Sequence, residues 1–232
     1  MIKFAPILLA LVYGLVSYRF SAWRLAKTLD EQSTELADPI LKGFCDQLAG
    51  ALELPRIKVH IYETEPINGL AAPDGRIFIT RGLYNKFLAG DVSAEEITSV
   101  IAHELGHMAL GHSRKRMISF SGQNALRTAF AMVLSRFIPF VGGWIADGLT
   151  TLMMARLSRK DEFEADAYAA ALLHKAGIGV APQKTLFANL ESLNKGNTGA
   201  KPAWLLHHPK THDRIAAIEK LERKWGVPGE AE

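Results

Sequence analysis

Five consecutive residues determine how this sequence is interpreted: His103-Glu104-Leu105-Gly106-His107. On an α-helix, residues four positions apart lie one turn apart on the same face, so both imidazoles can direct a ring nitrogen at one Zn²⁺ ion. Glu104 lies beside that face, where a carboxylate can accept a proton from water activated by the metal. Chance alone predicts far fewer than one such pattern in a chain with 8 His among 232 residues, so two unrelated surface histidines are a poor explanation.

The flanking residues predict the helix that this motif requires. A capping box at residues 93–96 (Ser-Ala-Glu-Glu) marks the start of a helix. Apolar residues then recur at helical spacing: Ile97, Val100, Ile101, Leu105 and Met108. Earlier in the chain, Asp38 is expected to cap a helix over residues 39–52, and short strands are expected at 57–62 and 77–79.

A catalytic zinc ion normally has three protein ligands and a water, so a third ligand must come from elsewhere. The metzincin spacing requires Gly and His where this chain has Leu110 and Ser113, which excludes that class. His112 lies about 140° around the helix from His107, so it cannot share the metal. We expect His112 to be a structural residue at the end of the helix.

An acidic segment at residues 158–166 offers the missing ligand. Glu162 and Asp166 lie on one face of a helix, whereas Glu164 points about 200° away from Glu162. We interpret Glu162 as the third metal ligand and Asp166 as the carboxylate behind the metal site that orients a ligand imidazole. The alternative is a charged surface patch, which would leave the zinc ion without a third ligand.

The composition excludes several other classes of protein. A hydrophobic share of 48% is too high for an intrinsically disordered chain. The single cysteine, Cys45, excludes a disulfide scaffold. A formal net charge of +3 gives no reason to expect nucleic acid as a partner.

The N-terminal segment is apolar, since residues 4–18 carry no charge and the basic residues Arg19, Arg24 and Lys27 follow. Counted to Trp23, the segment approaches the roughly 20 residues that cross a membrane, and no credible cleavage site follows it. We therefore expect an uncleaved anchor. A cleaved signal peptide and a buried helix of a soluble protein are the alternatives. More basic residues follow the segment than precede it, which favours a cytoplasmic catalytic part.

Together these motifs resemble the gluzincin peptidases of the HtpX and CAAX prenyl protease family, which includes the periplasmic relatives BepA and LoiP. Residues 68–83 resemble the family's Asn-Ala-Phe-Ala segment and the strand that follows it. Residues 111–112 resemble the polar end of its zinc helix, and residues 208–215 resemble its late His-Pro…Arg-Ile signature. The resemblance spans residues 38–225.

The resemblance implies an α+β, mostly helical gluzincin-type metallopeptidase domain with a small β-sheet over residues 38–226. An apolar helix within residues 1–30 would precede it. The implied activity is hydrolysis of peptide bonds in extended polypeptide substrates, which would be misfolded, envelope or membrane proteins, with one Zn²⁺ per chain and Glu104 as general base and acid. The implied location is the inner membrane of a bacterium, with a single N-terminal anchor. Signal cleavage would instead leave a periplasmic protein.

In such peptidases an extended substrate adds a strand to the edge of the sheet beside the metal. Asn68, Gly69, Leu70 and Ala71 would form this edge, although Gly69 and Leu70 stand where the family has Ala and Phe. An ordinary hairpin is the alternative.

The late signature contains His208 and Arg214. The resemblance places His208 near the cleft, where it would donate a hydrogen bond to the oxyanion, act as a fourth, autoinhibitory zinc ligand, or be structural. Arg214 is expected to anchor this segment. A different class of function is a zinc-containing, chaperone-like binding module with little proteolytic activity. Glu104 argues against it, because a structural zinc site has four protein ligands and needs no base.

Overall fold

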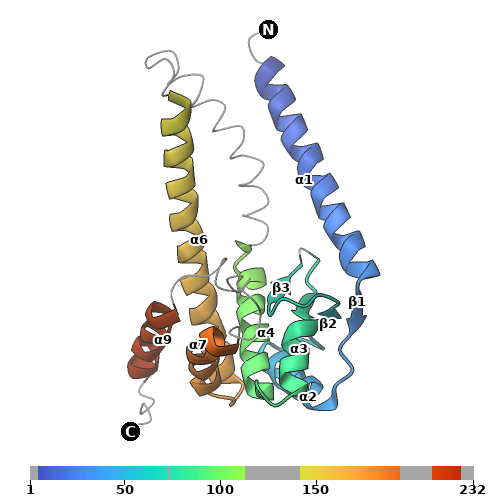
Figure 1. The fold of residues 1–232 in the computed structure, drawn as a ribbon, viewed down its shortest axis with the longest axis vertical. Helices are drawn as coiled ribbons and strands as arrows, with labels where there is room; N and C mark the ends of the chain where they lie inside the picture. The colour runs from blue at the N-terminus through green and yellow to red at the C-terminus, as the bar shows by residue number, and fades with distance from the viewer. Residues whose placement is uncertain (1–4, 73, 113–141, 194–210, 226–232) are drawn as a thin grey trace.

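The computed structural model describes residues 5–72, 74–112, 142–193 and 211–225. The described helices are α1 (Ala5–Glu31), α2 (Pro39–Ala51), α3 (Arg81–Leu88), α4 (Ala94–Ala109), α6 (Gly142–Lys175), α7 (Ala181–Leu193) and α9 (Thr211–Trp225). The described strands are β1 (Ser33–Glu35), β2 (Val59–Tyr62), β3 (Gly69–Ala71) and β4 (Ile77–Thr80). Figure 1 shows the resulting arrangement, which confirms the expected mostly helical α+β fold with a small sheet.

The four strands form one sheet in the order β1-β2-β4-β3. β2 and β4 are parallel, whereas β1 pairs with β2 and β3 pairs with β4 in antiparallel fashion. The expected strands at 57–62 and 77–79 are confirmed as β2 and β4, and their pairing with each other was not predicted. β1 was not expected, because the sequence Ser-Thr-Glu has no alternation of apolar and polar residues.

Side-chain caps define where the helices start. Asp38 accepts hydrogen bonds from the amides of Ile40 and Leu41, which confirms the expected start of α2. Ser93 and Glu96 form the reciprocal capping box that was expected before α4. This start fixes the register of α4, and with it the direction in which the zinc motif faces.

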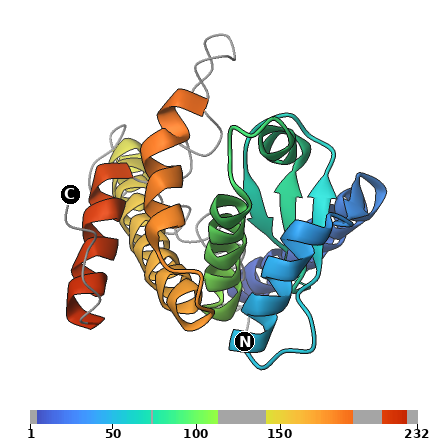
Figure 2. The ribbon, with the colours of Figure 1, turned by 90° about the horizontal axis from the view of Figure 1, so that it is seen from below.

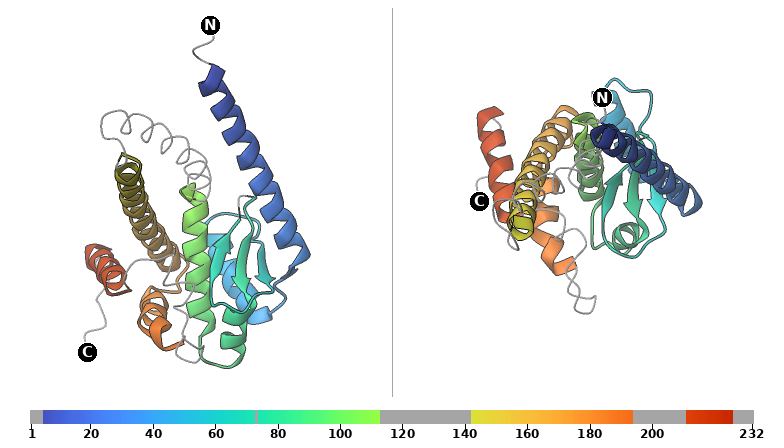
Figure 3. Two further views of the ribbon diagram at one scale, coloured as in Figure 1. Left: turned by 45° about the horizontal axis from the view of Figure 1, so that its top comes forward. Right: turned by 90° about the horizontal axis from the view of Figure 1, so that it is seen from above.

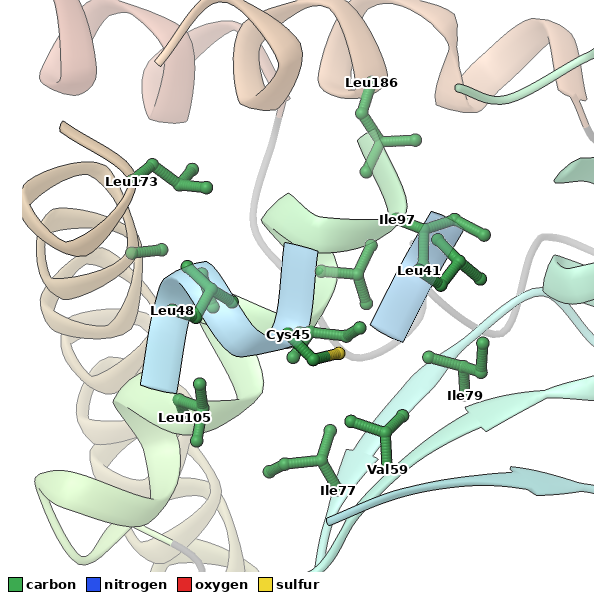
Figure 4. Close-up of a cluster of buried hydrophobic side chains, with 14 of the residues drawn as sticks. Leu41, Cys45, Leu48, Val59, Ile77, Ile79, Ile97, Leu105, Leu173 and Leu186 are labelled. Atoms are coloured by element: carbon green, nitrogen blue, oxygen red, sulfur yellow. The ribbon is translucent and has the colours of Figure 1, made fainter. Parts of the chain in front are cut away.

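The main core lies between one face of the sheet and helices α2, α4, α6 and α7 (Figure 4). It contains the thiol of Cys45 and many buried aliphatic side chains. Among the aliphatic residues are Leu41, Leu48, Val59, Ile77, Ile79, Ile97, Leu105, Leu173 and Leu186. A smaller cluster covers the other face of the sheet, where Leu29 of α1 packs with Phe78 and Ala72.

α4 lies between the sheet and the helices α6, α7 and α9 (Figures 1 and 2). Gly106, the fourth residue of the zinc motif, lets α6 approach closely. A Cβ on Gly106 would lie 2.9 Å from the carbonyl oxygen of Ala165 and 3.3 Å from Cβ of Tyr168. A side chain here would force the two helices apart, so Gly106 keeps the ligands of α4 and α6 within reach of one another.

α1 extends past the body in the same direction as the N-terminal part of α6 (Figure 3). Several of its large apolar side chains are exposed: Val12, Leu15, Val16, Phe20 and Trp23. No helix in the described part of the chain is both long enough and apolar enough to cross a membrane.

Candidate metal centre

Three buried side chains from two helices direct one ligand atom each at the same point. Nε2 of His103 lies 3.1 Å from Nε2 of His107. The carboxylate of Glu162 on α6 places one oxygen 3.4 Å from Nε2 of His103 and the other 3.4 Å from Nε2 of His107. This triangle of donors could hold a metal ion.

The spacing and chemistry of the triangle fit zinc. A tetrahedral zinc ion with ligand distances near 2.0–2.1 Å holds its ligand atoms about 3.3 Å apart. The two Nε2 atoms lie 3.1 Å apart, and each oxygen of Glu162 lies 3.4 Å from one of them. The side chain of Glu162 is 0% exposed. A carboxylate buried among imidazoles is a costly charge unless a cation neutralises it, and a divalent metal does so.

Behind the triangle, Asp166 and Arg214 hold the ring of His103. Nδ1 of His103 lies 2.9 Å from a carboxylate oxygen of Asp166. Arg214 of α9 donates two hydrogen bonds to Asp166, each 2.6 Å long, and its guanidinium lies 4.0 Å from the ring centre of Phe187. Asp166 thus contacts His103 on the side away from the donor triangle, and its role in orienting a metal ligand stays a prediction. The contact between Arg214 and the metal centre was not expected.

His112 is not part of the donor triangle and lies just after the end of α4, as expected, but its contact with His107 was not expected. It is fully buried, and its Nδ1 lies 3.0 Å from Nδ1 of His107. The helical wheel could not show this contact because α4 ends at Ala109 and the chain reverses at Gly111, whose φ is +68°. A glycine directly after a helix is the usual signal for such a reversal, so Gly111 could have revealed this contact.

Glu104 lies outside the donor triangle and against the sheet. Its side chain is buried, and a Cβ on Gly69 of β3 would lie 3.1 Å from its Cγ and 3.2 Å from its Oε1. The absence of a side chain at Gly69 therefore lets the candidate base and the edge strand approach each other. Of the described strands, β3 pairs only with β4, and it lies at one end of the sheet.

The family model described as peptidase family M48 matches residues 35–222. The chain belongs to peptidase family M48. It is 29% identical to the metalloprotease LoiP of Escherichia coli K12 over 171 residues, which cover 74% of this chain and 65% of LoiP. It is 32% identical to the metalloprotease YcaL of the same bacterium over 170 residues, covering 69% of this chain and 63% of YcaL.

A mitochondrial relative is similar as well. The chain is 26% identical to the metalloendopeptidase OMA1 of Bos taurus over 185 residues, which cover 76% of this chain and 34% of OMA1. The M48 chain described here thus spans less than two thirds of the length of LoiP, YcaL and OMA1.

The electrostatics of the M48 centre favour a cation. Burial lowers the pKa of His103, but hydrogen bonds to Asp166 and Glu162 outweigh it and raise that pKa to about 9. Burial raises the pKa of Asp166, yet Arg214 and the hydrogen bond from His103 outweigh it and hold that pKa at about 2. The carboxylates around His103 thus create a negative potential at the point where the donors converge.

The remaining expected site residues are only partly described. Gly69, Leu70 and Ala71 form β3, and Asn68 immediately precedes it. His208 lies outside the described residues of this M48 chain, so the three roles considered for it stay predictions.

Proposed function

We propose that this chain is a zinc-dependent endopeptidase that hydrolyses peptide bonds in extended polypeptide substrates. One observation supports this most strongly: three buried donors spaced for zinc lie next to a buried carboxylate that is not one of them. A purely structural zinc site has no use for Glu104, whereas a hydrolytic site needs a base in this position.

His103, His107 and Glu162 would hold one zinc ion. When bound, zinc supplies a Lewis acid that polarises the scissile carbonyl and increases the acidity of water in the site. Asp166 would keep the ring of His103 in its ligand orientation, with Nδ1–H donated to the carboxylate. Arg214 would in turn keep Asp166 charged and in place.

Glu104 would act as the base and later as the acid. Its carboxylate takes a proton from the attacking water and then delivers that proton to the departing amine nitrogen as the peptide bond breaks. The low exposure of Glu104 keeps bulk water from competing for the proton. If His208 lies near the cleft, as the family resemblance implies, it would donate a hydrogen bond to the oxyanion or restrain the site as an additional ligand.

The substrate would bind along β3 as an added strand. The amide of Thr80 donates to the carbonyl oxygen of Asn68, and the amide of Ala72 donates to the carbonyl oxygen of Arg76. The backbone groups of Asn68 and Ala72 therefore face β4. Because backbone groups alternate in direction along an antiparallel strand, those of Gly69 face the outer edge. A polypeptide paired with this edge passes beside Glu104, and only an extended chain can pair in this way. Misfolded or envelope proteins are the substrate class that offers such chains.

The test is cleavage of unfolded casein by the full chain. Wild type should cleave it, and either a zinc chelator or Glu104→Gln should abolish cleavage, while Glu104→Gln should still bind zinc. Zinc binding by a wild-type chain that protects casein from aggregation without cleaving it would support the chaperone-like module instead. The variant Lys42→Gln, at an exposed position on α2, controls for unspecific effects of substitution.

We further propose that α1 holds the protein at a membrane. Supporting this are the apolar side chains of α1 that remain exposed, among them Phe20 and Trp23, which are 58% and 59% exposed. Aromatic residues of this kind favour the membrane–water interface. Lys27 and the neighbouring basic residues would then lie toward the headgroups.

A further inference from the structure

A second imidazole contacts one of the candidate zinc ligands from the side away from the donor triangle. Nδ1 of His112 lies 3.0 Å from Nδ1 of His107. Nε2 of His112 lies 3.2 Å from a carboxylate oxygen of Glu164 and 3.6 Å from one of Asp161. The ring of His112 is 0% exposed, so it is held between His107 and the two carboxylates.

The distance between the two Nδ1 atoms requires one shared proton. Two protons would repel each other, and none would leave two lone pairs face to face. Nε2 of His107 belongs to the donor triangle, so a metal there uses the lone pair of Nε2 and leaves the proton on Nδ1. Nδ1–H of His107 then donates to His112, whose neutral ring carries its own proton on Nε2 and donates it to Glu164 or Asp161.

We propose that His112 is a positioning residue that fixes the orientation and the tautomer of His107 for zinc. This inference rests on the zinc site of the proposed function. His112 would do for His107 what Asp166 does for His103, so that each imidazole is held from behind by a hydrogen-bond acceptor. The two carboxylates of α6 complete the chain, because they give the Nε2–H of His112 a place to donate.

The same argument decides between this role and a second metal site. His112, Asp161 and Glu164 lie close enough together to hold an ion. A metal on Nε2 of His112 would move the proton of that ring to Nδ1, where it would meet the Nδ1 proton of His107. Zinc in the triangle and an ion on His112 are therefore incompatible, and one zinc ion per chain is expected.

Two substitutions separate positioning from mere packing. His112→Asn keeps an acceptor on Cγ, where Nδ1 of the imidazole is attached, so it can still accept from His107. His112→Gln places its polar atoms one bond further out and presents a methylene group to that N–H. We expect the Gln variant to raise the Kd for zinc by about 10–100-fold and the Asn variant to stay within about 3-fold of wild type. The double variant Asp161→Ala with Glu164→Ala, at partly exposed positions, should raise it by about 10-fold.

The measurement is competition for zinc between the full chain and a chromophoric chelator. The visible spectrum of the Co²⁺ form gives a second readout, which should change for Gln and not for Asn. The free energies of unfolding of the metal-free variants identify any loss of zinc affinity that arises only because a variant folds less stably. The inference would be overturned if the Asn and Gln variants changed the Kd for zinc equally and the double variant left it unchanged. It would also be overturned if the wild-type chain bound two zinc ions. A wild-type chain that binds no zinc would overturn the proposed function itself.

Discussion

Arg214 and Asp166 form a buried ion pair in which Nε and a terminal nitrogen of the guanidinium each lie 2.6 Å from a different carboxylate oxygen. Both side chains are 1% exposed. The same guanidinium lies 3.4 Å from Nδ1 of His103, so one arginine from the last described helix contacts both the candidate ligand and the carboxylate that orients it.

Removal of Arg214 should therefore destabilise the protein strongly. Arg214→Ala leaves the charge of Asp166 buried without its partner, which costs about 3–5 kcal/mol of the free energy of unfolding. Urea unfolding of the metal-free chain measures this. Lys184→Ala breaks the pair between Lys184 of α7 and Glu222 of α9, whose side chains are 25% and 10% exposed, and should cost less, about 1–2 kcal/mol. Equal losses for the two variants would contradict the importance of the buried pair.

Metal analysis of single variants should identify the ligands. Glu162→Ala removes a ligand and should leave the purified chain without bound zinc, whereas Glu164→Ala should retain one zinc ion. Asp166→Ala should weaken zinc binding or activity by about 10–100-fold. Zinc loss from Glu164→Ala with retention in Glu162→Ala would show that the ligand assignment is wrong, and unchanged affinity and rate in Asp166→Ala would remove that residue from the site.

A methyl group at Gly69 should disturb the base. Its Cβ would lie 2.6 Å from Cγ1 of Val100 and 3.1 Å from Cγ of Glu104, so one of these side chains has to move. We expect Gly69→Ala to cost about 1–3 kcal/mol of stability and to lower casein cleavage. Adding Val100→Ala makes room for the methyl group and should restore part of the stability and part of the casein cleavage. No gain from the second substitution would mean that the clash with Val100 is not the cause.

The single thiol should report on opening of the core. Burial, together with Asp46, raises the pKa of Cys45 to about 12. Thiols react as thiolates, so alkylation of the native chain at pH 8 should be far slower than that of the same chain in urea. Mass spectrometry follows the reaction. Equal rates in the two solvents would show that the thiol of Cys45 is not buried in the core in solution.

The N-terminal proposal predicts retention of the segment and membrane binding through α1. Intact mass of the native protein should include residues 4–23, and membranes washed with alkaline carbonate should retain the chain. Val16→Glu with Phe20→Glu should reduce this retention, whereas Ile40→Glu, at an equally exposed site on α2, should not. A product shorter by some 20 residues that is found in the soluble fraction would favour a signal peptide.

Local patterns predicted much of this molecule, and chain reversals and non-local pairing account for what they missed. The spacing of Glu162 and Asp166 anticipated that both would face the imidazoles, since four residues make one helical turn. The expectation that His112 does not join the donor triangle agrees with the structure, but its contact with His107 depends on the reversal at Gly111, which a helical wheel does not represent. The parallel pairing of β2 with β4 depends on contacts across the sequence, and no local periodicity encodes it.

The junction between α1 and the sheet determines how any surface that binds α1 would orient β3. β1 follows α1 after a single residue and pairs with β2, and Leu29, near the end of α1, is buried against Phe78. A rotation of α1 would therefore rotate the sheet and its outer strand as well. A membrane that holds α1 would consequently fix the direction from which a polypeptide can approach β3. Substrates would then be selected first by whether they can reach β3 from that direction.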